Sequence, residues 1–201
     1  MGIPRDSIGR VIGERVRAAR RAREWTLDRL AERSGVSRRM VVNVESGEAN
    51  PSIATLLRLA EALGIGLPSL VEPPADTGSR VTRTGEGAVL WSGDGGGRGV
   101  LVTGEDAPEV FELWEWTLAP GERHASEPHT AGARELLLVV DGEVVIEVGE
   151  ETHALSAGDA LRFDGSRPHA YRNDGGSRTR FCLAVLEPAA GAANKEGRQD
   201  G

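Results

Sequence analysis

The chain has 201 residues and a formal net charge of −7, from 24 Lys and Arg and 31 Asp and Glu residues. This length suffices for two small domains. Its single cysteine, Cys182, excludes an intramolecular disulfide framework and a zinc cluster built on thiolates. No apolar run approaches the roughly 20 residues of a membrane span, and the first residues lack the apolar stretch of a signal peptide. We therefore expect a cytoplasmic protein without a membrane partner.

The charge is divided unevenly along the chain. Residues 1–72 carry 12 Arg against 9 Asp and Glu, a balance of +3. Residues 73–201 carry 12 Lys and Arg against 22 Asp and Glu, a balance of −10. A nucleic acid responds to the local field of the face it meets more than to the total charge. The basic N-terminal part is therefore the candidate for contact with phosphate groups.

Apolar residues recur at helical spacing in the N-terminal part, which predicts a bundle of five helices. Their expected ranges are residues 8–23, 27–34, 38–46, 53–63 and 67–71. Residues Ser7, Thr26 and Ser37 stand where N-caps are expected, and Gly35 can end the second helix in a left-handed conformation.

Residues 26–47 predict two short helices joined at Gly35, the arrangement of a DNA-reading helix-turn-helix. In the second of these helices, the helical period turns Val41 and Val44 toward the core. The same period leaves an outward face made of Arg38, Arg39, Val42 and Asn43, with Met40 at its margin.

The first 70 residues resemble the XRE-like, phage-repressor type of helix-turn-helix. The resemblance rests on Arg17 and Arg20, Leu30-Ala31, Gly35-Val36-Ser37, Val44-Glu45-x-Gly47 and Pro51-Ser52. It implies that the third helix enters the major groove of an operator, where arginine suits guanine and asparagine suits adenine. The residues that it places at the DNA are Arg17, Thr26, Ser37, Arg38, Arg39, Met40 and Asn43.

The same resemblance implies an ion pair between Arg20 and Glu45, which fastens the first helix to the third. Glu45 is then a structural carboxylate and not a catalytic one. For the arginines of the third helix, the alternative to DNA contact is a solvated helix face.

Beyond residue 72 the pattern changes. Residues 73–87 hold Pro, Gly, Asp and Ser without periodic apolar residues and predict a linker. From residue 88 to 188 the apolar period becomes 2, which predicts a β-sandwich or barrel. Asp141-Gly142 predicts a β-hairpin, and residues 189–201 predict a disordered tail. The expected strands cover residues 88–91, 100–102, 110–118, 135–140, 143–148, 160–163 and 179–186.

The second half resembles the cupin family from about Val110 to Leu186. One block runs from Gly121 through Glu135 to Gly142, and the other runs from Gly158-Asp159 to Pro168-His169 and Asn173. The resemblance implies a double-stranded β-helix, also called a jelly-roll barrel. The chain would then be an α plus all-β two-domain protein, with a helix-turn-helix domain over residues 1–72 and a cupin domain over 88–188.

In metal-binding cupins the first block supplies His-x-His and a later Glu, and the second block supplies one more His. This chain has Glu127 where the first His is expected, and one residue more than usual between His129 and Glu135. Together with His169 and with Glu127 or His124, these residues would suit one zinc, iron, nickel or manganese ion. The alternative is a polar pocket lining that binds no metal.

Trp114 and Trp116 share one face of a strand because side chains alternate along it. Together with Arg162 and either Phe111 or Phe163, they are expected to line a pocket for a small polar or anionic molecule. Packing of the core is the alternative interpretation of these aromatic residues.

These features predict a sequence-specific DNA-binding transcriptional regulator that is not an enzyme. Its cupin domain would sense a small-molecule effector and help a homodimer to form, because one small helix-turn-helix rarely contacts enough DNA for a specific affinity. The alternative is a metal-dependent cupin enzyme of the dioxygenase or isomerase type, with the helix-turn-helix as an accessory head.

Overall fold

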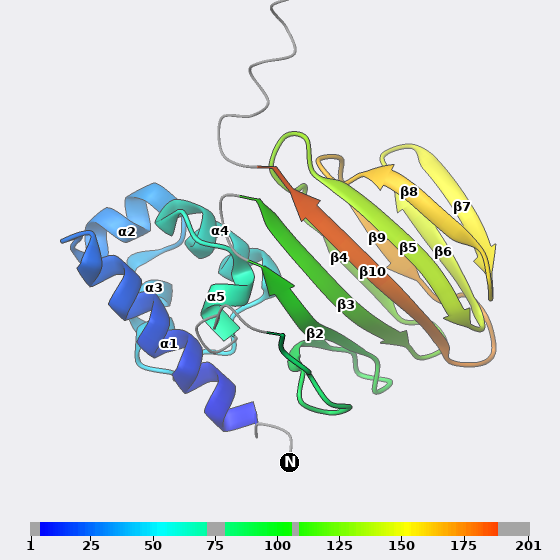
Figure 1. The fold of residues 1–201 in the computed structure, drawn as a ribbon, viewed down its shortest axis with the longest axis horizontal. Helices are drawn as coiled ribbons and strands as arrows, with labels where there is room; N and C mark the ends of the chain where they lie inside the picture. Colours follow the sequence, from blue (N-terminus) through cyan, green and yellow to red (C-terminus); the bar gives the residue numbers. More distant parts are fainter. Residues whose placement is uncertain (1–4, 72–78, 106–108, 189–201) are drawn as a thin grey trace, which may run out of the picture. The chain divides into compact units, whose positions relative to one another are not determined.

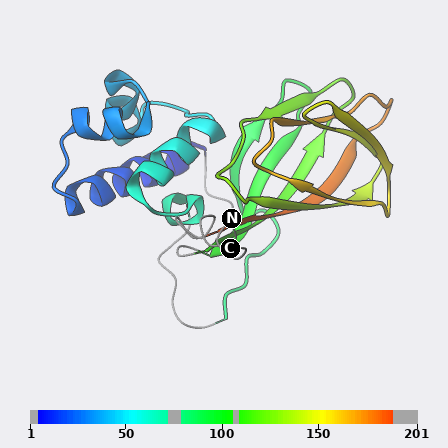
Figure 2. The same cartoon turned by 90° about the horizontal axis from the view of Figure 1, so that it is seen from above.

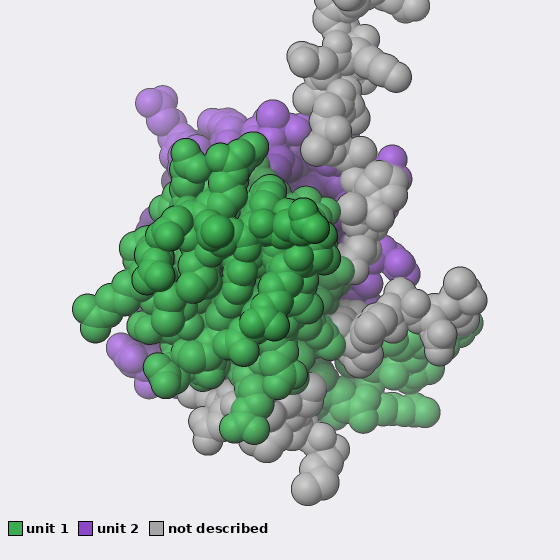
Figure 3. Space-filling view, turned by 90° about the vertical axis from the view of Figure 1, so that its left-hand side faces the viewer, with its two compact units in different colours: residues 1–90 green, residues 91–201 purple. Residues whose placement is uncertain are grey.

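The structure, a computed structural model, describes residues 5–71, 79–105 and 109–188 (Figure 1). The chain forms two compact units, residues 1–90 and residues 91–201 (Figure 3). The expected linker over residues 73–87 lies partly outside the described residues, and the expected tail over residues 189–201 lies wholly outside them. None of the helices in the described ranges is long and apolar enough to cross a membrane.

The first unit contains the expected helices. Their bounds are α1 Arg5–Ala22, α2 Leu27–Ser34, α3 Arg38–Glu45, α4 Ile53–Leu63 and α5 Leu67–Val71. Helix α1 begins before Ser7, so the expectation that Ser7 caps this helix was wrong. The bundle core consists of side chains at most 7% exposed: Ile12, Val16, Leu30, Val36, Val41, Val44, Leu56, Leu59, Leu63, Leu67 and Leu70.

The turn between α2 and α3 is built from local hydrogen bonds. The Thr26 hydroxyl accepts a hydrogen bond from the Arg29 amide at 3.1 Å, which caps α2. The Ser37 hydroxyl accepts one from the Met40 amide at 3.3 Å, which caps α3. Between the two helices Gly35 has φ 64°, a left-handed conformation that a residue with a Cβ rarely adopts.

The expected ion pair between Arg20 and Glu45 is confirmed. Arg20 Nε and Nη2 donate to the two carboxylate oxygens of Glu45 at 2.6 and 2.8 Å. Arg20 Nη1 also donates to the Trp25 carbonyl, and Arg17 Nη2 donates to the Glu45 carbonyl, both at 2.7 Å. Because Glu45 is only 7% exposed and ends α3, these contacts hold α3 at a fixed angle against α1.

The second unit is built from antiparallel strands in two sheets. The strands are β1 Ala88–Ser92, which begins in the last residues of the first unit, β2 Arg98–Glu105, β3 Val110–Leu118, β4 Arg123–Ser126, β5 Arg134–Asp141, β6 Glu143–Val148, β7 Glu151–Ser156, β8 Ala160–Asp164, β9 His169–Arg172 and β10 Thr179–Glu187. One sheet has the order β1-β2-β3-β10-β5-β8 and the other has the order β4-β9-β6-β7. The two sheets face each other and enclose the core, as Figure 2 shows.

Strands β4, β7 and β9 were missed by the sequence analysis, and all three belong to the four-stranded sheet. The expected β-hairpin at Asp141-Gly142 was also wrong. Strand β5 pairs with β10 and β8, whereas β6 pairs with β7 and β9, so the turn carries the chain from one sheet to the other. Gly142 has φ 75°, which lets the backbone make this corner.

We expect Glu45→Ala to lower the free energy of unfolding by about 3 to 5 kcal/mol, because Arg20 would keep a poorly solvated charge without its partner. DNA binding should weaken with it. Chemical denaturation measures the loss. Glu32→Ala, which breaks an exposed ion pair with Arg29 in α2, is the matched control and should cost about 1 kcal/mol or less. Equal losses in the two variants would contradict the structural role of Glu45.

Candidate metal centre and nucleic-acid interface

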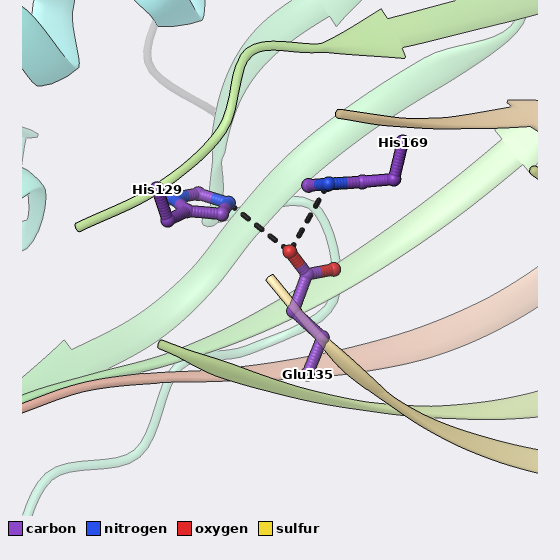
Figure 4. Close-up of side chains that lie close together, drawn as sticks. All are labelled: His129, Glu135 and His169. Carbon is purple, nitrogen blue, oxygen red and sulfur yellow. Dashed lines mark ion pairs between the residues drawn. The ribbon is translucent and has the colours of Figure 1, made fainter. Parts of the chain in front are cut away.

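The structure brings three of the sequence-predicted metal ligands together inside the barrel. His129 follows β4, Glu135 lies near the start of β5, and His169 begins β9. One ligand atom from each lies within 4.8 Å of the others. Glu135 Oε1 is 3.1 Å from His129 Nε2 and 3.0 Å from His169 Nε2 (Figure 4). Side-chain exposure is 8% for His129 and zero for the other two, so the cluster is shielded from solvent.

Hydrogen bonds behind the two imidazoles determine which nitrogen faces the centre. His169 Nδ1 lies 2.8 Å from the Arg167 carbonyl, which can only accept, so this nitrogen carries a proton. His129 Nδ1 lies 2.9 Å from Glu187 Oε1. Both rings therefore turn Nε2 toward Glu135. Tyr171 donates to Glu135 Oε2 at 2.7 Å and holds that carboxylate in place.

This arrangement places electron-rich atoms against one another. While both imidazoles are neutral, neither Glu135 Oε1 nor His169 Nε2 has a hydrogen-bond partner within the described residues, although both atoms are buried. Orphaned buried polar atoms are rare in proteins because each costs its full desolvation energy. A cation at this point would satisfy both atoms, and two imidazoles with one carboxylate form a ligand set that suits a divalent transition metal.

The charges of the cluster also favour a cation. Burial alone would raise the pKa of Glu135, but hydrogen bonds and charge from the two histidines outweigh burial and lower this pKa to about 2. Burial would lower the pKa of His129, but Glu135 and Glu187 raise it to about 10. Without an ion, His129 therefore takes up a second proton and donates it to Glu135 Oε1, and a metal ion would replace that proton.

The two fourth-ligand candidates lie outside this cluster. Glu127 is exposed. His124, on β4, packs against Trp116 at a ring-centroid distance of 4.6 Å. Burial lowers the pKa of His124 to about 4, with smaller contributions from His169 and Arg123, so its ring is neutral at pH 7.

Two further carboxylates inside the barrel were missed by the sequence analysis. Glu187 is the last residue of β10 and contacts His129. Glu112, on β3, is 4% exposed; its Oε2 accepts a hydrogen bond from Trp114 Nε1 at 2.8 Å, whereas its Oε1 has no partner among the described residues. The sequence could have indicated Glu112, because side chains alternate along a strand and Glu112 therefore shares the inward face of Trp114.

The residues expected to line a pocket divide between the inside and the outside of the barrel. Trp114, Trp116 and Phe163 are buried, with the two tryptophan rings stacked at 5.9 Å. Arg162 is exposed, so its assignment to the pocket was wrong, and Phe111 is 51% exposed. The physical reason is the alternation of side chains along a strand, since neighbours such as Arg162 and Phe163 point to opposite faces.

The predicted DNA contacts lie on and around α3. Arg38 is exposed and forms an ion pair with Asp28 of α2 at 2.8 Å. Arg39 is exposed and has no ion pair with any described residue. Met40 is 36% exposed, and Asn43 is half-buried. Arg17 is tied to Glu45, whereas Thr26 and Ser37 are exposed helix caps.

Comparison with known proteins covers both units. Residues 16–70 match the Helix-turn-helix family model, and residues 114–186 match the Cupin domain model. The HTH-type transcriptional regulator SutR of Escherichia coli is 28% identical over 91% of this chain and 98% of its own length. The uncharacterized HTH-type transcriptional regulator y4dJ of Sinorhizobium fredii is 34% identical over 34% of this chain and 88% of its own length. A crystal structure of an HTH_3 family transcriptional regulator from Vibrio cholerae has 25% identity and a TM-score of 0.74, covering 92% of this chain and 99% of its own.

The chain belongs to the helix-turn-helix transcriptional regulators, and its second unit contains a match to the Cupin domain model.

As a helix-turn-helix regulator, the protein binds DNA. The fold class predicted from the sequence, a helical bundle followed by a cupin barrel, is confirmed. The two carboxylates that were missed, Glu112 and Glu187, lie just outside the part of the regulator that matches the cupin model.

We expect the stability of the protein to depend on pH through Glu112. Burial raises its pKa from 4.5 to about 7, so as the pH rises the unfolded chain loses this proton before the folded regulator does. The penalty on the folded state is absent below about pH 4.5 and complete above about pH 7. Relative to the wild type, Glu112→Gln should therefore gain up to about 3 kcal/mol of stability between pH 5 and pH 8, measured by urea denaturation. A difference that stays constant over this range would disprove the assignment.

Proposed function

We propose that this regulator binds an inverted-repeat operator as a homodimer, and that its cupin barrel holds one divalent metal ion and receives a small-molecule effector. Exposure of α3 supports the DNA contact, and the unpartnered Glu135 Oε1 and His169 Nε2 support the metal. Two-fold pairing follows from the small size of one helix-turn-helix head. Because the relatives are bacterial regulators, we place its action in the cytoplasm.

Among the arginines of α3, Arg39 is the best placed to reach a base. Its side chain is exposed and has no ion pair within the part of the chain that the structure describes. Arg38 is held by Asp28, so a contact between Arg38 and DNA would first have to break that pair. Arginine donates two parallel hydrogen bonds to guanine O6 and N7 in the major groove. Met40 and Asn43 complete the proposed reading face, with Arg17, Thr26 and Ser37 at its border.

In the barrel, His129, Glu135 and His169 would hold the ion through two Nε2 atoms and Oε1, and zinc, iron, nickel and manganese all accept such ligands. A bound ion would supply a positive centre to which an effector can attach. Glu187 forms a hydrogen bond with His129 Nδ1, and the Arg167 carbonyl forms one with His169 Nδ1, so each imidazole presents Nε2 to the ion. Trp114, Trp116 and Phe163 form the aromatic part of the lining.

The same ligand set also supports oxygen chemistry in metal enzymes. SutR, whose similarity to this chain spans both units, is nevertheless named a transcriptional regulator. We therefore propose that the barrel of this chain senses and does not catalyse.

We expect Arg39→Ala to weaken binding to the regulator's own promoter by about 1 to 3 kcal/mol, roughly 5- to 150-fold in Kd. Fluorescence anisotropy at one fixed salt concentration measures this loss. Arg123→Ala, which removes the same charge from the cupin unit, is the control and should leave the affinity unchanged. An equal loss on random DNA would assign Arg39 to a phosphate, and no loss at all would remove it from the interface.

For the metal, we expect tag-free protein to bind about one equivalent of a divalent ion, and His129→Ala and His169→Ala to abolish this binding. Glu187→Gln should retain the ion with an affinity about 10- to 100-fold lower, because carboxylate partners of ligating histidines typically contribute this much. Elemental analysis and competition with a chelating dye measure content and affinity. Glu143→Gln, an exposed change on β6, should leave both unchanged. Absence of binding in the wild type would leave a polar pocket without metal.

A further inference from the structure

The outer face of the six-stranded sheet carries a continuous apolar patch. Eight large hydrophobic side chains are exposed in the described residues, and five of them lie on this face. They are Phe111 (51% exposed), Leu113 (43%), Leu136 (55%), Leu138 (48%) and Val140 (39%). Surface hydrophobic residues that are scattered singly are ordinary, but a contiguous group marks an interaction site.

Strand pairing shows that the patch is continuous. Strand β10 lies between β3 and β5, and Ala184 on β10 stands opposite both Leu113 and Leu136. One pair of residues further along, Cys182 stands opposite Leu138. Leu113 and Leu136 therefore flank the small side chain of Ala184, and Glu115 and Leu138 flank that of Cys182. A surface with ridges beside a shallow trough can interdigitate with a copy of itself.

The charges around the patch allow a second copy to approach. Residues 73–201 carry a balance of −10, so most faces of this unit would repel one another. On this face, however, Arg180 pairs with Glu115 at one end at 4.0 Å, and Arg134 pairs with Asp164 at the other end at 3.8 Å. Exposed Arg162, which stands opposite Leu136 on the edge strand β8, adds a further positive charge. An apolar centre with a rim of both signs is the usual anatomy of a protein interface.

The size of the face also fits. Six strands at a spacing of about 4.8 Å, with about seven residues each, span roughly 25 by 25 Å, on the order of 600 Å² of flat surface. Because side chains protrude from the sheet, the accessible area of the face is larger than this flat value. A stable interface buries about 800 Å² on each partner, so a dimer would use nearly the whole face together with the relief of its side chains.

We propose that two copies of this chain pair through the outer face of the six-stranded sheet, around Leu113, Leu136, Leu138 and Ala184. This inference rests on the proposed homodimer and names the surface that forms it. A two-fold interface uses the same patch on both subunits, so the patch must complement itself in shape and in charge. The central position of Cys182 makes the one thiol of the chain a reporter for this interface.

The test compares Leu136→Asp/Leu138→Asp with Val81→Asp in the full-length chain. Val81 is 65% exposed outside the patch and receives the same kind of substitution. Light scattering after size exclusion should show a dimer for the wild type and Val81→Asp, and a monomer for the double variant. Because Leu136 and Leu138 point outward, circular dichroism should show an unchanged fold; Leu113→Asp on β3 repeats the test if the double variant fails to fold.

Alkylation of Cys182 by N-ethylmaleimide gives an independent result. In the wild type it should accelerate at least 10-fold on dilution below the dissociation constant of the dimer, and in the double variant it should be fast at every concentration. A wild-type monomer would overturn both the homodimer and this surface. A dimer that survives in both Leu136→Asp/Leu138→Asp and Leu113→Asp and leaves Cys182 reactive would overturn the surface alone. A monomer with Cys182 protected at every dilution would show that another part of the same chain covers the face, which also overturns the proposal.

Discussion

The barrel is organised around one buried carboxylate oxygen, Glu135 Oε1, which two imidazole nitrogens approach at 3.0 and 3.1 Å. Tyr171 contacts the other oxygen of this carboxylate. His129 precedes Glu135 in the chain, whereas His169 and Tyr171 lie far beyond it on β9, so only the closed barrel brings these side chains together. Each imidazole is held from behind through Nδ1, by Glu187 or by the Arg167 carbonyl, and cannot turn away without losing that contact. Fixed partners of this kind keep a ligand set in place, and they are why we favour a metal over an ordinary polar lining.

The helical unit also contains a buried carboxylate, but there an arginine of the same unit neutralises it. Glu45 is buried at the end of α3, and the guanidinium of Arg20 in α1 satisfies both of its oxygens. Here the charge has a partner of opposite sign within the chain, so no further ion is required. The pair is structural: it holds α3 at an angle that leaves Arg39 exposed. In the barrel, by contrast, the two imidazoles balance the charge of Glu135 only when they are protonated; otherwise Glu135 and His169 meet with two acceptor atoms, and this difference favours a cation at the proposed site.

Local signals account for what could be predicted from the sequence. Caps such as Thr26 and Ser37, the left-handed Gly35 and the helical period determine the helix-turn-helix, because each acts over a few residues. The short strands β4 and β9 carry His, Arg and Ser and lack the apolar alternation that reveals a strand, so they were missed. Glu112 and Glu187 were missed because a carboxylate is not expected on an inward face. The error at Arg162 was different in kind, since alternation along β8 already places it opposite to Phe163.

Alternation also connects the two surfaces proposed for the barrel. On β5, Glu135 points inward to the histidines and its neighbour Leu136 points outward to the apolar patch. On β3, Glu112 likewise points inward and Leu113 points outward. The same strands therefore form the wall between the ligand site and the dimer surface, so any displacement of these strands by a ligand would be transmitted to the interface directly. A mechanical link of this kind becomes regulation only if the wall has two arrangements that ligand and partner favour differently. Because the side chains of the two surfaces point to opposite faces, outward substitutions at Leu136 leave the ligand set intact, and the coupling can be measured separately from binding.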